Sequence, residues 1–194
     1  MAYEFLKLAK RRKTTYEFED RKISRNMLLK ILEAGRLAPS CGNAQPWHFI
    51  VIRNKKKIRE CLSTCYTGHL FTEPPVLVAI VMVIPKEEIL RQLACVKGGI
   101  PNIGEIQKCI GCSAMSMVYA AESLGINSAL MSPDPKITKQ RLNIPDPFRC
   151  EIIVGFGYEK KNAQKRKRER KPLSEIVSYE LWKTNRKKKK QQLI

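Results

Sequence analysis

Residues 31–52 are I-L-E-A-G-R-L-A-P-S-C-G-N-A-Q-P-W-H-F-I-V-I, and this stretch decides the fold because it joins the end of a helix to a strand. Ser24 is a favourable N-cap residue, and apolar and small residues follow it at helical spacing: Leu28, Ile31, Leu32 and Gly35. Pro39 ends this helix, because proline cannot continue it. Trp47–Ile52 is short, β-branched and aromatic, which predicts a strand.

The same alternation of helical and strand patterns continues along the chain. Val76–Ile84 is apolar at every position, which is typical of a strand covered by helices on both faces. Residues 105–124 are small or apolar at helical spacing up to Gly125, which predicts a buried helix. The other expected elements are helices at 55–66, 135–142 and 172–182, strands at 128–131 and 151–156, and a glycine-rich loop at 97–104.

Strands separated by helices predict a layered α/β or α+β domain with a mostly covered sheet. No repeat and no interior linker divides the chain, so we expect one domain over residues 1–182. The remaining residues, 183–194, are basic and are expected to form a disordered tail.

Composition excludes several classes of protein. Hydrophobic residues make up 43% of the 194 positions, so the chain can bury a core, and disorder is excluded for most of it. The longest apolar stretch, Pro75–Pro85, is too short for a bilayer-crossing helix, which needs about 20 residues. Residues 1–20 carry no apolar segment of the kind that a secretory signal has. We therefore expect a cytoplasmic protein without a membrane span.

The chain is strongly basic, with 37 Lys and Arg against 18 Asp and Glu and a formal charge of +19. This balance permits a basic nucleic-acid-binding module, which is an alternative function from another class. Aromatic residues are not interleaved with the basic ones as stacking platforms would be, and no recognition motif is present. Nucleic acid is therefore not expected as the main partner.

Three polar clusters interrupt the apolar pattern. The first, R-R-K-T-T-Y at residues 11–16, combines cations with hydroxyls and suits a phosphate, although composition alone favours a solvated charge run. The second, A-P-S-C-G-N-A-Q-P-W at 38–47, holds ordinary turn residues, yet Ser40, Asn43 and Gln45 also suit a polar heterocycle. The third, K-R-E-R-K-P-L at 167–173, is by itself typical of a solvated segment or a nonspecific nucleic-acid patch.

The common nucleotide-binding fingerprints are absent. No G-x-G-x-x-G follows the first strand and no G-x-x-x-x-G-K-[ST] is present, so a Rossmann or P-loop interpretation has no support. His48 and His69 lack a partner motif and are expected to be structural.

Seven cysteines leave a metal or iron–sulfur site open as a further alternative. Such a site would draw on Cys61, Cys65, Cys95, Cys109 and Cys112. The spacing argues against it, because Cys109 and Cys112 lie three apart on the expected buried helix and no second C-x-x-C is present. Reduced thiols are expected, and Cys41 in the second cluster is the one we expect to be functional.

The order of these motifs resembles the FMN-dependent nitroreductase family. The specific part is the A-P-S-x-x-N-x-Q-P-W block, followed by A-A-E-S-L-G at 120–125, V-G-F-G-Y at 154–158 and R-K-P-L-S-E-I-V at 170–177. The resemblance implies an α+β nitroreductase-like layered fold, with a central mixed sheet flanked by helices, in an intertwined homodimer. It also implies an enzyme that passes a hydride from NADH or NADPH through FMN to a nitroaromatic, quinone or similar small acceptor by a ping-pong mechanism.

The resemblance also assigns residues of this chain to the flavin, and it implies no catalytic side chain and no metal ligand. The phosphate, ribityl chain and ring edge are assigned to Arg12, Lys13, Thr14 and Tyr16. Tyr16 stands where the family has a cation, which leaves Arg11 as an alternative phosphate contact. The segment supplied by the partner subunit in the family matches Pro39, Ser40, Cys41 and Asn43. The stretch near the isoalloxazine matches Met131 and Ser132, and the C-terminal phosphate contacts match Arg168 and Arg170.

Overall fold

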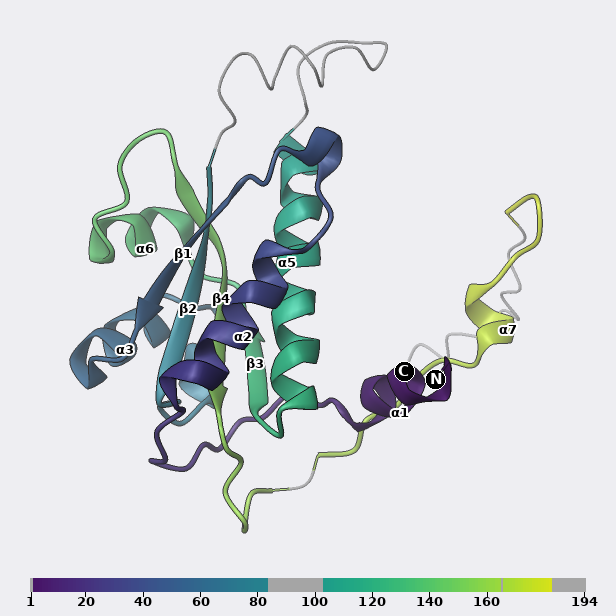
Figure 1. The fold of residues 1–194 in the computed structure, drawn as a ribbon, viewed down its shortest axis with the longest axis horizontal. Helices are drawn as coiled ribbons and strands as arrows, with labels where there is room; N and C mark the ends of the chain where they lie inside the picture. The colour runs from purple at the N-terminus through teal and green to yellow at the C-terminus, as the bar shows by residue number, and fades with distance from the viewer. Residues whose placement is uncertain (1, 84–102, 165, 183–194) are drawn as a thin grey trace, which may run out of the picture. The chain divides into compact units, whose positions relative to one another are not determined.

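The computed structural model describes residues 2–83, 103–164 and 166–182 (Figure 1). The chain divides into two compact units, Met1–Ala163 and Gln164–Ile194, and each is a separate body below. The expected tail at 183–194, Cys95 and most of the expected loop at 97–104 lie outside the described residues. The last two residues of that loop, Ile103 and Gly104, belong to a helix.

The first unit holds the following elements in chain order: α1 (Ala2–Arg11), α2 (Arg25–Arg36), η1 (Cys41–Asn43), β1 (Trp47–Ile52), α3 (Lys55–Leu62), η2 (Gly68–Leu70), β2 (Val76–Met82), α5 (Ile103–Ser123), β3 (Asn127–Met131), α6 (Pro135–Arg141) and β4 (Arg149–Gly157). The second unit holds the short helix α7 (Leu173–Ile176). The helices and strands expected between residues 24 and 157 are confirmed, with ends that differ by a few residues.

Two helical regions differ from the sequence expectation. The helix expected at 172–182 is only the four residues of α7, because every described residue of this segment is exposed and no apolar face is buried to support a longer helix. Helix α1 was not expected, since its many charges conceal an amphipathic pattern. It packs through Phe5, whose ring centroid lies 5.0 Å from that of Tyr119 on α5.

The four strands form one sheet in the order β1-β2-β4-β3. All three strand pairs are antiparallel, where a mixed sheet was expected. The sequence pattern does not reveal strand direction, because an antiparallel strand that is covered on both faces is as uniformly apolar as a parallel one. Among the described residues, the parallel pairing is an isolated bridge between Thr14 and Ser128.

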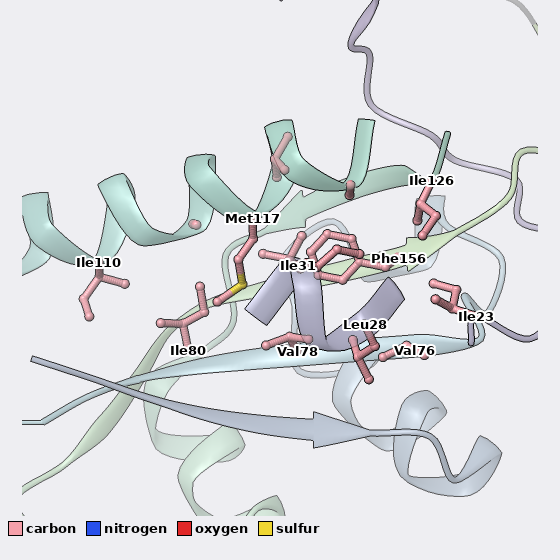
Figure 2. Close-up of a cluster of buried hydrophobic side chains, with 14 of the residues drawn as sticks. Ile23, Leu28, Ile31, Val76, Val78, Ile80, Ile110, Met117, Ile126 and Phe156 are labelled. Carbon is pink, nitrogen blue, oxygen red and sulfur yellow. The ribbon is translucent and has the colours of Figure 1, made fainter. Parts of the chain in front are cut away.

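Helices cover both faces of this sheet, which makes the first unit an α+β layered fold (Figure 1). On one face, α2 and α5 pack over β2 and β4, and Figure 2 shows the side chains of this core, including Ile31, Met117 and Phe156. On the other face, α3 and α6 cover a second core. Every residue of β2 is buried, which confirms the covered strand that its apolar sequence predicts.

Local signals set the helix ends as expected. The Ser24 side chain accepts a hydrogen bond from Met27 N at 3.2 Å and caps α2. Helix α2 ends at Arg36, shortly before Pro39. In the described part of the chain, no helix is both long enough and apolar enough to cross a lipid bilayer.

Candidate functional site

The first polar cluster leaves α1 and continues along the sheet as an extended segment. Thr14 forms the parallel bridge with Ser128 on β3, and Thr15 donates its backbone N–H to the Ser128 carbonyl at 3.0 Å. Phe18 then makes an antiparallel bridge with Glu159, just after β4. These backbone contacts hold the segment against the ends of two neighbouring strands and so determine where its side chains lie.

Two cations of this cluster are paired with carboxylates. Arg11 donates from Nε to the Glu122 carboxylate at 2.7 Å and from Nη2 to the Glu122 carbonyl at 2.8 Å. Lys13 Nζ donates to the Glu159 carboxylate at 2.5 Å. Because the Glu122 side chain is only 8% exposed, its charge needs this guanidinium as a partner. The pairing gives Arg11 a structural role and argues against it as the alternative phosphate contact.

The remaining side chains of the segment alternate between the interior and the surface. Thr14 is exposed, Thr15 is fully buried, and Tyr16 is half-buried. The Tyr16 ring stacks on Phe71, with centroids 4.9 Å apart and planes 4° from parallel. The Tyr16 backbone carbonyl accepts the Thr72 N–H at 2.9 Å. Tyr16, which replaces a cation of the family pattern, is therefore held in place as an aromatic side chain.

Thr15 carries an unusual polar group. Within the described part of the chain, its Oγ1 is a buried side-chain atom that has no hydrogen-bond partner. Burying a hydroxyl without a partner costs about 1–3 kcal/mol. Because its neighbours Thr14 and Tyr16 reach the surface, the Thr15 hydroxyl faces the core and not the surface that they line.

The second polar cluster forms a tight turn around η1. Three of its residues have left-handed backbone angles, with φ of 53° at Gly42, 56° at Asn43 and 48° at Gln45. Such angles are uncommon for residues other than glycine and are concentrated at functional sites. Ser40 stabilises the turn, since its hydroxyl accepts the Gln45 N–H at 3.0 Å and its carbonyl accepts the Asn43 N–H at 3.1 Å. The residues assigned here by resemblance are exposed or half-buried: Pro39, Ser40, Cys41 and Asn43.

The two clusters contact the long helix α5 at places far apart. The turn contacts the first half of α5, where Cys41 N donates to Cys109 Sγ at 3.4 Å. The first cluster contacts the last turn, where Arg11 meets Glu122. The two helix positions are 13 residues apart, and at about 1.5 Å per residue this separates them by roughly 20 Å. Figure 1 shows η1 and α1 near opposite ends of α5. One chain therefore does not bring the two clusters into one small site.

The third candidate region follows β3. Met131 is buried in the second core and is only 2% exposed. Ser132 is exposed, and its carbonyl accepts the Tyr66 N–H at 3.1 Å. This segment directly follows β3, the strand that the first cluster bridges at Ser128.

Arg168 and Arg170 belong to the second unit. Both are exposed, and Arg170 Nη1 donates to the Glu169 carbonyl at 2.8 Å. Because the two units are separate bodies, the assignment of these arginines to a phosphate stays a prediction.

The cysteines divide into an exposed group and a buried group. Cys41 and Cys112 are exposed, whereas Cys61, Cys65 and Cys150 are buried in the second core. Burial raises the pKa of Cys61 and of Cys65 to about 11 and that of Cys150 to about 12. Over the described ranges, no three His, Cys, Asp or Glu side chains gather closely enough to hold a metal ion.

Two residues that shape the site were not among those expected from the sequence. Glu122 anchors Arg11, and its signal was a carboxylate in the otherwise uncharged second half of α5, which requires a cation. Phe71 orients Tyr16 and had no local signal, because the two residues are distant in sequence and meet only in the fold.

Comparison with known proteins identifies relatives of this chain. The sequence profile of the nitroreductase family matches residues 9–93. A provisionally named NADH dehydrogenase/NAD(P)H nitroreductase of Archaeoglobus fulgidus is 30% identical over 162 residues, which cover 81% of this chain and 86% of the relative.

Solved structures share the fold. A nitroreductase family protein of Clostridium difficile is 27% identical and has a TM-score of 0.75, with 92% of this chain and 99% of that chain covered. A provisionally named nitroreductase of Desulfovibrio desulfuricans, crystallised in complex with FMN, is 22% identical and has a TM-score of 0.72, with 93% of this chain and 98% of that chain covered. The fold and the relative from Archaeoglobus fulgidus lead to the same conclusion: the chain belongs to the nitroreductase family of oxidoreductases.

Proposed function

We propose that this oxidoreductase binds FMN, takes a hydride from NADH or NADPH, and passes electrons to a small acceptor such as a nitroaromatic or a quinone. Membership of the nitroreductase family, a flavin-dependent family, supports the general reaction. The FMN complex of the Desulfovibrio desulfuricans relative supports the choice of flavin. Residues 1–182 would act as one catalytic domain in the cytoplasm.

The donor groups of the first cluster fit a flavin mononucleotide. A phosphate needs fixed cations and hydroxyl donors, and here Arg12 and Lys13 directly precede Thr14, which is exposed. The Lys13 ammonium has further hydrogens to donate besides the one that contacts Glu159. Arg168 and Arg170 would complete the phosphate contacts.

The observation that carries the proposal is the placement of the two clusters near opposite ends of α5. Residues about 20 Å apart along a helix cannot contact the same ring of a flavin in one chain. In a two-fold dimer, the first cluster of one protomer can meet the second cluster of its partner. We infer a homodimer with two flavin sites, each formed by both protomers.

In this arrangement the protein would bind and orient the flavin, and the flavin would supply the redox chemistry. Bound FMN would accept a hydride from the nicotinamide and release electrons to the acceptor. Arg12, Lys13 and Thr14 would hold the phosphate and ribityl chain, while Tyr16 and Ser132 would lie at the ring edge. The turn of Ser40 and Asn43 would present donors and acceptors to the heterocycle from the partner protomer.

Spectroscopy of the purified protein tests the cofactor. The protein should be yellow and absorb near about 450 nm, as oxidised flavins do, and protein stripped of its cofactor should rebind added FMN. A colourless preparation that does not bind FMN would contradict the proposed function.

Steady-state kinetics test the reaction. Assays with NADH and with NADPH against nitroaromatic and quinone acceptors should give parallel reciprocal plots, because one flavin site serves donor and acceptor in turn. Intersecting lines would contradict the ping-pong mechanism while leaving the family assignment in place.

A further inference from the structure

We propose that Cys41 and Cys109 form a redox-active thiol pair that closes to an intramolecular disulfide in the presence of a peroxide. The two residues connect the turn around η1 to α5. The Cys41 N–H donates to Cys109 Sγ at 3.4 Å, and that thiol donates to the Glu105 carbonyl at 3.2 Å. The bond involves these two thiols alone, and Cys41 belongs to the same turn as Ser40 and Asn43, which the proposed function assigns to the flavin.

The hydrogen bond between the two residues limits their separation. With Sγ of Cys109 3.4 Å from N of Cys41, standard bond lengths keep the two Cα atoms within roughly 8 Å of each other. A disulfide requires a Cα–Cα distance of about 4.4–6.8 Å. A shift of the turn by about 1 Å at most therefore brings the Cα–Cα distance into this range.

The two thiols differ in their access to solvent. Cys41 is exposed, whereas Cys109 is only 6% exposed and lies directly beneath the turn. An oxidant in solution therefore meets Cys41 first, and Cys109 is the neighbouring thiol that can resolve the oxidised product. This pairing of an exposed cysteine with a second cysteine in contact is typical of redox-sensitive sites.

A cation lies near both sulfur atoms. The pKa of Lys108 is raised, first by its hydrogen bond to Glu105 and the charge of that carboxylate, and further by the negative charge of Cys109 and Cys41 in their thiolate forms. Lys108 is thus within electrostatic range of both cysteines.

The reaction proceeds in two steps. The Cys41 thiolate attacks one oxygen of hydrogen peroxide, so that an S–O bond forms, the O–O bond breaks, and the departing hydroxide takes a proton and becomes water. Cys109 then attacks the Cys41 sulfur, so that the S–S bond forms and the S–O bond breaks with release of a second water. Two thiols lose two electrons and two protons, and one peroxide is reduced to two waters.

The other thiols are worse candidates for this reaction. Burial and a raised pKa keep Cys61, Cys65 and Cys150 protonated near neutral pH. Cys112 is exposed but lies three residues further along α5 than Cys109, and Cys109 is the one that contacts Cys41. The consequence is local, because the bridge would fasten the turn that carries Ser40 and Asn43 to α5.

Peptide mapping of the oxidised full-length protein tests the pair. Reduced protein is treated with hydrogen peroxide, free thiols are blocked with N-ethylmaleimide, and a tryptic digest is analysed without reduction. The tryptic peptide of residues 37–53 should be joined to that of residues 109–136, and dithiothreitol should separate them. On a non-reducing gel the protein should stay at the mass of one chain.

Matched variants identify the bonded sulfur, because the second peptide contains both Cys109 and Cys112. The link should persist in Cys112→Ser and disappear in Cys109→Ser and in Cys41→Ser. The last variant changes only an exposed side chain, so its folding is not in question. The proposal is overturned if the link survives in Cys109→Ser, if oxidation joins two chains, or if wild-type Cys41 is oxidised to sulfinic acid without forming the link.

Discussion

The buried hydroxyl of Thr15 is the residue whose environment most clearly predicts the effect of a substitution. Valine has nearly the same shape and removes a polar group that has no partner among the described residues. We expect Thr15→Val to raise the free energy of unfolding by up to about 1 kcal/mol, measured by urea denaturation.

Thr138→Val is the matched control for this substitution. Thr138 is also fully buried, but its Oγ1 donates to Thr64 Oγ1 at 2.7 Å, so the same change should lower the free energy of unfolding by about 1 kcal/mol. If Thr15→Val were instead the more destabilising of the two substitutions, the Thr15 hydroxyl would have to form a hydrogen bond in the folded protein.

Arg170 tests the proposed phosphate contacts at the level of a single side chain. A charge-assisted hydrogen bond to a phosphate is worth about 1.5–3 kcal/mol, so Arg170→Ala should weaken FMN binding by about tenfold to a hundredfold. Lys171→Ala, next to it and not assigned to the flavin, should change the affinity little. A titration with FMN, followed by flavin fluorescence, measures the affinity of each variant. Equal affinities in the two variants would refute the assignment of Arg170.

At the level of elements, α2 and α5 depend on a glycine where they meet. A Cβ at Gly35 would overlap Met117 Cε and would lie 2.8 Å from Met117 Cγ. At the same point, Ser113 Oγ donates to the Gly35 carbonyl at 2.9 Å. The close approach of the two helices explains why the sequence has glycine inside a helix, where it is otherwise unfavourable.

Gly35→Ala should therefore lower the free energy of unfolding by about 1–3 kcal/mol, because the added methyl group overpacks the interface between the helices. Gly111→Ala on α5 is the control, since a Cβ there meets nothing within 4 Å. That substitution should be neutral or stabilising by up to about 1 kcal/mol, because alanine favours a helix. Thermal unfolding of both variants tests this explanation. Equal losses of stability in the two variants would show that crowding at Gly35 is not the cause.

The buried thiols of the second core predict how stability depends on alkaline pH. Burial raises the pKa of Cys150 from 9.0 to about 12, so the unfolded chain releases this proton at lower pH than the folded one. The contribution to stability is complete below about pH 9 and is lost as the pH rises toward 12. In urea unfolding between pH 8 and 11, the decline should be steeper for wild type than for Cys150→Ala. Parallel curves would show that Cys150 does not carry the effect.

At the level of the whole molecule, the separation of the two polar clusters makes dimerisation part of the proposed site. Arg12→Ala and Asn43→Ala should each impair both flavin sites of their own homodimer. In a heterodimer of the two variants, one site receives both substitutions and the other receives none.

We therefore expect the heterodimer, isolated with two different affinity tags, to bind about one FMN per dimer with wild-type affinity. If each site were formed by a single chain, every site of the heterodimer would carry one substitution, and no site of wild-type affinity would be found. Equilibrium binding of FMN to the three dimers distinguishes the two arrangements.

The sequence by itself determined the order of helices and strands between residues 24 and 157, because these depend on local patterns. Ser24 caps a helix, and the uniformly apolar Val76–Met82 is a covered strand, through interactions that repeat within a few residues. The sequence also marked all three polar clusters through their composition, and their order supported the resemblance to the nitroreductase family.

Only the tertiary structure decided which way the strands run, which residues pair, and how far apart the clusters lie. The antiparallel sheet, the pairing of Arg11 with Glu122 and the stacking of Tyr16 on Phe71 each join residues that are distant in sequence. No local period encodes such contacts, because they arise when the sheet and α5 pack together. The same packing leaves the turn around η1 near one end of α5 and the first cluster at the other.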